Sequence, residues 1–117
     1  MPKFGADALL DKDQIGQVVE YVLKISGQEH DEALAVGGAT VFAENCAACH
    51  QENGLGDRAQ GAPKLTDAIW LYGGTREAVT LTLVNGRFGV VPNWSPRLTE
   101  AEICAVAFYV HGRGGGE

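Results

Sequence analysis

The sequence predicts an all-α protein, and three observations lead to this prediction. Apolar residues recur at helical spacing in four segments, capping pairs stand in front of two of them, and no segment alternates between apolar and polar residues as a strand does. Of the 117 residues, 45% are hydrophobic and 21% are charged. This composition is typical of a folded domain and excludes disorder as a description of the whole chain.

The first predicted helix covers residues 11–26. Asp11 and Gln14 are spaced as a capping box, and Gly27 stands where a glycine commonly ends a helix. The polar stretch 28–32 predicts a linker. The expected buried face of this helix consists of residues three or four positions apart: Ile15, Val18, Val19 and Val22.

The second and third predicted helices flank a long irregular stretch. The second runs from about Ala33 to Cys46, and the third covers residues 75–85 and ends at Gly86. Residues 51–65 are rich in glycine, and a loop of this length in a small domain is usually functional. One side of the second helix is expected to carry Leu34, Gly38, Val41 and Phe42.

The last predicted helix covers residues 99–111. Thr99 and Glu102 repeat the capping-box spacing of the first helix. An amphipathic helix of this kind is expected to bury its apolar face. That face consists of Ile103, Val106, Ala107 and Val110.

The two ends of the chain are similar in sequence. Residues 1–4 read Met-Pro-Lys-Phe, and residues 91–94 read Val-Pro-Asn-Trp. The same spacing then separates a Leu, an Ile and a Tyr in both segments: Leu10, Ile15 and Tyr21, and Leu98, Ile103 and Tyr109. Two explanations stay open. Either two capped amphipathic helices are alike by chance, or residues 1–27 are the end of a preceding, homologous domain.

Residues 46–50 read Cys-Ala-Ala-Cys-His, the Cys-x-x-Cys-His attachment sequence of c-type haem (heme c). Two thiols on one helical turn reach the two vinyl groups at one edge of a porphyrin. The adjacent His is then carried under the ring, where an imidazole nitrogen can bind the iron.

Two other kinds of site use the same residue types. A thioredoxin-type redox pair requires a preceding strand in a βαβ unit, which this sequence lacks. A zinc site requires four ligands, and Cys104, His30 and His111 provide no second pair with ligand spacing. We therefore expect one covalently attached haem.

With these residues the chain resembles the class I cytochrome c family. In that family a helix with a glycine and an aromatic residue enters the motif, a loop with a proline follows, and the C-terminal helix carries an aromatic residue. The chain is most similar to the C-terminal haem domain of the dihaem subunit III (CcoP/FixP type) of cbb-type cytochrome c oxidases. The matching positions are Gly38, Phe42, Pro63 and Tyr109 and the segments 70–74, 85–89, 92–94 and 109–111.

The resemblance implies a fold and a division of the chain. The fold is three to five helices wrapped around one haem, preceded by one extra N-terminal helix. Residues 1–27 would be the C-terminal helix segment of a preceding cytochrome c domain, residues 28–32 a linker, and residues 33–117 the cytochrome c domain.

The resemblance also implies the roles of single residues. Cys46 and Cys49 would form the thioethers, and His50 would be the proximal iron ligand. The Pro63 carbonyl would accept a hydrogen bond from the other nitrogen of His50. Arg87 would pair with a haem propionate, or else be a solvated surface charge. The haem-binding set is completed by Leu65, Trp70, Val91 and Trp94, of which the two Trp are also explained as core residues.

One position departs from the family. Its members present a Met before Pro-x-Trp as the distal iron ligand, whereas this chain has Val91 there and its only Met is Met1. Loss of the thioether is expected to lower the reduction potential. Three arrangements stay open: an open or water-bound iron; replacement by His111, His30 or Lys64; and Met1 of a neighbouring molecule, reaching the iron by domain exchange.

The expected function is one-electron transfer. The resemblance implies a donor cytochrome c and the oxidase core subunits as partners, without turnover by this domain itself. A net charge of −6 argues against nucleic acid as a partner. No apolar run is long enough to span a bilayer, and no secretory leader is visible. We expect a periplasmic fragment of a protein anchored to the bacterial inner membrane. The alternative is CO or NO binding at an open iron. Cys104 is expected to be a small apolar filler.

Overall fold

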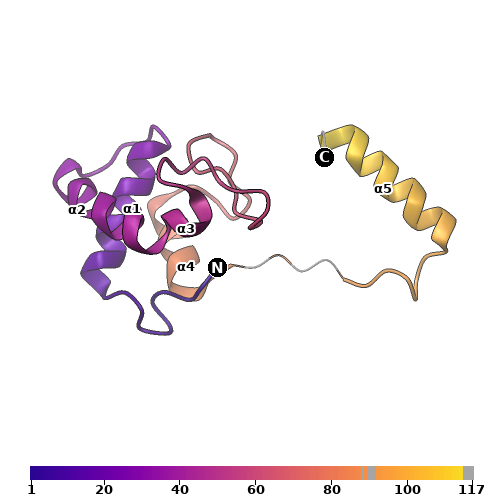
Figure 1. The fold of residues 1–117 in the computed structure, drawn as a ribbon, viewed down its shortest axis with the longest axis horizontal. Helices are drawn as coiled ribbons and strands as arrows, with labels where there is room; N and C mark the ends of the chain where they lie inside the picture. Colours follow the sequence, from indigo (N-terminus) through magenta and orange to yellow (C-terminus); the bar gives the residue numbers. More distant parts are fainter. Residues whose placement is uncertain (88, 90–91, 115–117) are drawn as a thin grey trace.

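The computed structural model describes residues 1–87, 89 and 92–114. This part of the chain contains five helices and no strand (Figure 1). The all-α prediction is confirmed, and the four predicted helices start and end within about three residues of the observed ones. The helices are α1 (Lys12–Ile25), α2 (Glu32–Asn45), α3 (Ala47–His50), α4 (Arg76–Asn85) and α5 (Glu100–Gly114).

α1 begins and ends as its sequence predicts. The Asp11 carboxylate accepts a hydrogen bond from the Gln14 amide at 2.8 Å, and the Gln14 side chain accepts one from the Asp11 amide at 3.0 Å. Gly27 has a φ of +77°, which a residue with a side chain rarely adopts. The capping box and the glycine therefore fix both ends of the helix.

α1 packs closely against α2. The rings of Tyr21 and Phe42 lie 5.1 Å apart at an angle of 51°. At Gly38 the backbones approach so closely that a Cβ atom would lie 2.0 Å from the carbonyl oxygen of Gln17. The prediction that one side of α2 faces the core is confirmed for Gly38, Val41 and Phe42, which are buried. It is wrong for Leu34, which is 42% exposed because it lies in the first turn of α2, ahead of the contact with α1.

The N-terminal segment completes the core beside α4. Phe4 and Leu10 are buried, and the Ala6 amide donates to the Val84 carbonyl at 2.9 Å. Each large apolar side chain buried in this way contributes about 1.5–3 kcal/mol. The core cluster consists of Phe4, Leu10, Ile15, Val18, Val19, Val22, Leu23, Val41, Phe42, Cys46, Val79 and Leu83.

α5 stands apart from the other helices. Figure 1 shows residues 92–98 leading away from α1–α4, and α5 contacts none of the other described helices. The predicted burial of its apolar face is wrong, since Val106 is 52% and Val110 is 60% exposed. Helical periodicity identifies an apolar face but not the surface that covers it, and α2 packs against α1 instead.

Two further predictions fail because α5 and the segment before it lie outside the core. Trp94 is 43% exposed, so its explanation as a core aromatic residue is wrong. The Arg97 guanidinium lies 5.4 Å from the centre of the Trp94 ring. Cys104 is exposed and carries a free thiol, so it fills no gap in the core.

Candidate functional site

The Cys-x-x-Cys-His residues form one tight turn at the end of α2. The Cys46 carbonyl accepts hydrogen bonds from the amides of Cys49, at 3.1 Å, and His50, at 2.9 Å. This turn is α3, and it brings the three side chains close together along the chain. Both thiols are free, and Cys46 is buried whereas Cys49 is exposed.

His50 is oriented by a residue from the following loop. Its Nδ1 donates a hydrogen bond to the Pro63 carbonyl oxygen at 3.0 Å. With the proton on Nδ1, the neutral ring keeps a lone pair on Nε2, which is the form that binds a metal. Burial lowers the pKa of His50, the hydrogen bond to Pro63 opposes this effect, and the nearby positive amino group of Met1 adds to it. The neutral, ligating form is therefore favoured at pH 7.

The loop that carries Pro63 is held by its own backbone. The Gly56 amide donates to the His50 carbonyl at 3.0 Å, and the Leu65 amide donates to the Gly54 carbonyl at 2.7 Å. Gly56 has a φ of +80°, and a Cβ atom there would lie 2.6 Å from the Ala62 carbonyl oxygen. The glycine-rich composition thus serves a tight fold that fixes the Pro63 carbonyl beside His50.

The Cys46 thiol is not prepared for nucleophilic redox chemistry. Burial, with a smaller contribution from Cys49, raises the pKa of the Cys46 thiol to about 11. A thioredoxin-type nucleophile instead needs a lowered pKa. The part of the chain that the structure describes also contains no group of three His, Cys, Asp or Glu side chains that could hold a metal ion. Two thiols that can form thioethers, beside an imidazole with a free Nε2, are the residues that a c-type haem needs, and these residues fit that group.

The other predicted haem-binding residues lie in several places. Leu65 and Trp70 are partly buried and pack against the core cluster. Arg87 is exposed, and its guanidinium lies 4.7 Å from the centre of the Tyr72 ring. The segment that holds Trp94 runs away from the motif, and Val91 lies outside the described residues.

The candidate replacement ligands are also separated. His30 uses both ring nitrogens, with Nδ1 2.9 Å from the Gln28 carbonyl oxygen and Nε2 2.8 Å from a Glu32 carboxylate oxygen. His111 lies in the last turn of α5. Lys64 is exposed in the loop next to the Pro63 carbonyl.

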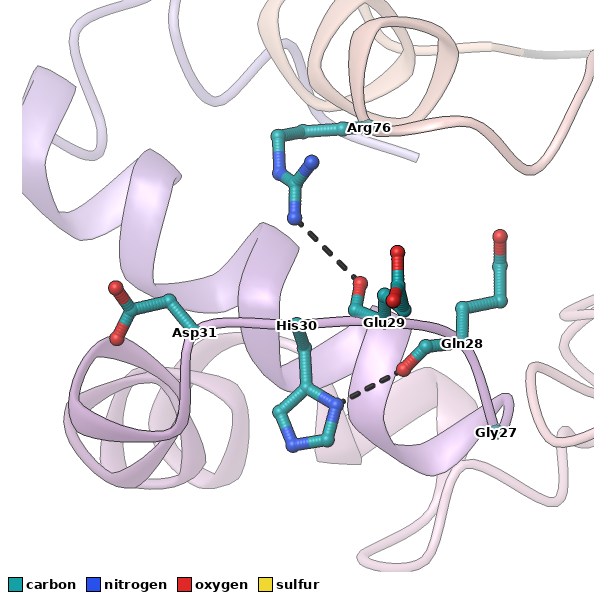
Figure 2. A pocket seen from close by; sticks show the side chains of 6 residues that line it. All are labelled: Gly27, Gln28, Glu29, His30, Asp31 and Arg76. Atoms are coloured by element: carbon teal, nitrogen blue, oxygen red, sulfur yellow. Dashed lines mark hydrogen bonds between the residues drawn. The ribbon is translucent and has the colours of Figure 1, made fainter.

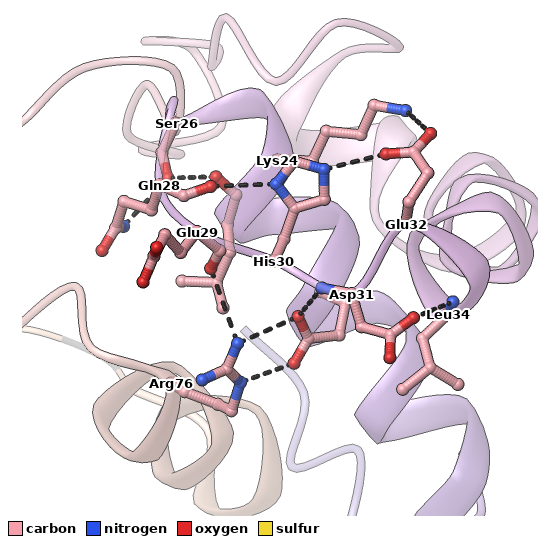
Figure 3. A network of polar contacts seen from close by, with 11 residues as sticks. Lys24, Ser26, Gln28, Glu29, His30, Asp31, Glu32, Leu34 and Arg76 are labelled. Carbon is pink, nitrogen blue, oxygen red and sulfur yellow. Dashed lines mark hydrogen bonds and ion pairs between the residues drawn. The ribbon is translucent and has the colours of Figure 1, made fainter.

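A polar groove lies at the connection between α1 and α2, and none of the motif residues lines it. Figure 2 shows Arg76 facing this connection from α4. In the surrounding network, the buried Glu20 accepts two hydrogen bonds from Arg76, at 2.5 and 3.1 Å, and Lys24 forms an ion pair with Glu32 at 2.6 Å (Figure 3). In the sequence, the one signal of this network is an acidic residue, Glu20, inside the largely apolar stretch 15–23, and that signal names no partner. The network joins α1 to α4 and to the start of α2, so its role is structural.

The comparisons with known proteins agree with this geometry. The cytochrome c family model matches residues 35–113. Over the whole chain, 69% of residues are identical to a protein named cbb3-type cytochrome c oxidase subunit CcoP from Cereibacter sphaeroides, and 50% to one of the same name from Azospirillum brasilense. The identity to a subunit named FixP from Azorhizobium caulinodans is 47%. The chain spans about 40% of the length of these relatives.

None of the described helices is both long and apolar enough to cross a membrane. The helical fold, the Cys-x-x-Cys-His turn, the imidazole held by a proline carbonyl and the family match thus lead to one assignment: the chain belongs to the cytochrome c family.

Proposed function

We propose that this chain transfers single electrons through one covalently attached haem c. Cys46 and Cys49 would form the two thioethers, and His50 would be the proximal iron ligand. The observation that carries the proposal is the hydrogen bond between His50 and the Pro63 carbonyl, because it fixes the tautomer and the orientation that iron ligation needs.

The chain's own residues would bind the group and control its surroundings. When bound, haem supplies an iron ion that can gain or lose one electron. Leu65 and Trp70 would provide apolar contact beside the core, and Val91 and Trp94 would do so when their segment is close. Arg87, which already covers the Tyr72 ring, would pair with a propionate.

We further propose the place of this chain in a larger assembly. The names of its relatives support an oxidase subunit that accepts electrons from a donor cytochrome c and passes them to the oxidase core. Haem attachment through thioethers and the same relatives support a periplasmic location, with an anchor in the bacterial inner membrane elsewhere in the whole protein. A charge of −6 supports a protein partner over nucleic acid.

The test is the optical spectrum of the full chain, matured in cells that attach c-type haem. We expect a haem c spectrum that persists after denaturation. Cys46→Ala and Cys49→Ala should each remove one attachment, and the double variant should release the haem on denaturation. Cys104→Ala is the matched control, because Cys104 lies outside the motif and should leave attachment unchanged. Attachment that survives the double variant would contradict the proposal.

A second candidate is binding of CO or NO, and the residue that favours it is Val91. A valine side chain has no atom that can bind iron, so the segment that holds Val91 lacks the usual methionine thioether ligand. Addition of CO to the reduced chain should then shift the spectrum, and Val91→Met should suppress the shift, with Val84→Met as a control for an added thioether. If the spectrum of the reduced chain does not change when CO is added, another residue is bound to the iron and electron transfer is the function.

A further inference from the structure

The indole of Trp70, which packs against the core cluster that includes Cys46, lies directly on Gly74. A Cβ atom on Gly74 would lie 2.6 Å from both Cδ1 and Nε1 of the indole. An alanine there would therefore collide with the ring, although the backbone of Gly74 is not in the left-handed region that favours glycine. The absence of a side chain at Gly74 is thus what makes room for the indole.

Residues 66–74 share little hydrogen bonding with the rest of the described chain. The Ile69 amide donates to the Asp67 carboxylate at 2.9 Å, and this contact is local. Among the described residues, a single hydrogen bond joins the segment to another part of the chain. In this bond, Nε2 of Gln28 donates to the Gly74 carbonyl oxygen at 3.0 Å, across 46 positions. Gln28 therefore fixes the backbone on which the indole lies.

The side chain of Gln28 is itself held in one orientation. Its Nε2 donates to the Ser26 hydroxyl at 2.9 Å (Figure 3), and this hydroxyl donates to the Leu23 carbonyl at 3.0 Å. Nε2 thus has two acceptors, the Ser26 hydroxyl and the Gly74 carbonyl, for its two hydrogens. The backbone amide of Gln28 also donates to the Leu23 carbonyl at 2.9 Å, directly after the turn at Gly27. The end of α1 therefore presents this amide to Gly74 in a defined direction.

The residues next to Gln28 and Gly74 are joined as well. The Arg76 guanidinium donates to the Glu20 carboxylate and lies 3.5 Å from the Glu29 carbonyl oxygen. The connection between α1 and α2 is therefore held against the start of α4 at two neighbouring points. Gln28 is thus a fixed point that places Gly74.

We propose that Gln28 is a positioning residue for Trp70 and acts through Gly74. This role rests on the proposed function, in which Trp70 provides apolar contact to the haem. Gln28 holds the Gly74 carbonyl, Gly74 supports the indole, and the indole shields the haem-binding site from water. The connection between α1 and α2 thereby controls the polarity around the iron, and with it the reduction potential.

The first test reads the position of Trp70 by NMR in the full chain, matured in cells that attach c-type haem and kept reduced. Gln28→Met keeps the length of the side chain and removes both donors. The nuclear Overhauser contact between the indole and the Gly74 Cα protons should be lost, whereas Gln60→Met, the same change in an exposed loop, should retain it. A retained contact in Gln28→Met would overturn the proposal. The contact is read whether or not haem is attached, so this failure is distinguishable from failure of the proposed function.

The second test uses the reduction potential to ask whether Gln28 acts through Trp70. Gln28→Met and Gly74→Ala should each lower the potential, because water that reaches the site favours the oxidised, more highly charged iron. Trp70→Leu should lower it too, and adding Gln28→Met should then cause no further loss. Gly16→Ala, where nothing lies within 4 Å of the added atom, is the control for alanine and should leave the potential unchanged. An unchanged potential in Gln28→Met, or a full further loss in the double variant, would overturn the proposal.

Discussion

At the scale of single residues, local and distant contacts differ in how well the sequence predicts them. The Cys46–His50 motif could be found because its chemistry lies within five consecutive residues. Glu20 could not, because its partners are the Asp31 amide, at 2.7 Å, and Arg76, which is 56 positions away. The hydrogen bond to Arg76 in particular keeps the pKa of Glu20 below its ordinary value of 4.5.

The Glu20 contacts predict an acid-sensitive stability. Because the folded-state pKa is lowered, the stabilisation is fully present above pH 4.5 and is lost as the pH falls through the lower, folded-state value. Arg76→Gln should lower the free energy of unfolding at pH 7, because it removes the partner of the buried Glu20, although water screens the half-exposed guanidinium. It should also flatten the pH dependence below about pH 4.5. Urea unfolding between pH 3 and pH 7 measures both effects, with Lys12→Gln as a charge-matched control; equal pH profiles for the two variants would contradict the assignment.

At the scale of helices, the sequence predicts which residues are helical but not which helices meet. Capping boxes and apolar spacing placed α1, α2, α4 and α5 correctly because these signals act within one or two turns. The close crossing of α1 and α2 depends on a single glycine, Gly38, facing the Gln17 carbonyl. A glycine inside a helix gives no sign of which backbone approaches it.

Gly38→Ala and Gly16→Ala separate these two effects. Both substitutions place alanine in a helix, which by itself stabilises by about 0.5–1 kcal/mol. At Gly16 nothing lies within 4 Å of the added Cβ, so this gain should appear. At Gly38 the added atom meets backbone, and a loss of about 2 kcal/mol or more is expected. Chemical unfolding at pH 7 measures the difference, and equal stability of the two variants would show that the crossing tolerates a side chain.

At the scale of the whole molecule, the sequence predicts the helices and the haem-binding motif correctly, but it predicts a buried position for α5 that the structure does not show. The site could be predicted in outline: the motif, the glycine-rich loop and Pro63 meet as expected. Burial of α5 could not be predicted correctly, because α1 and α5 share one apolar pattern and the pattern does not show which helix packs against α2. In α1 that packing is accompanied by an ion pair between Glu20 and Arg76, which are far apart in sequence.

The separate position of α5 predicts how the folded chain is cut. Arg97 is exposed and lies in the segment that leads to α5, whereas Arg76 starts α4 and is tied to Glu20. Brief treatment with trypsin should cleave after Arg97 at least about tenfold faster than after Arg76, because proteases act on exposed segments that can adapt to their sites. Mass spectrometry of the products measures the ratio. Comparable cleavage at both positions would show that α1–α4 is not the stable unit.

The adjacency of Met1 and Gly86 lets residues 28–86 and then residues 1–27 be joined into one continuous order. Reading residues 28–86 and then residues 1–27 gives an entry helix, the motif, the loop, α4 and a closing helix in one continuous order. The observed backbone brings the two ends of that order together, with the Met1 carbonyl oxygen beside Gly86. A gene that encodes residues 28–86 followed by residues 1–27, without residues 87–117, should therefore give the same folded unit, with its chain opened between Gly27 and Gln28.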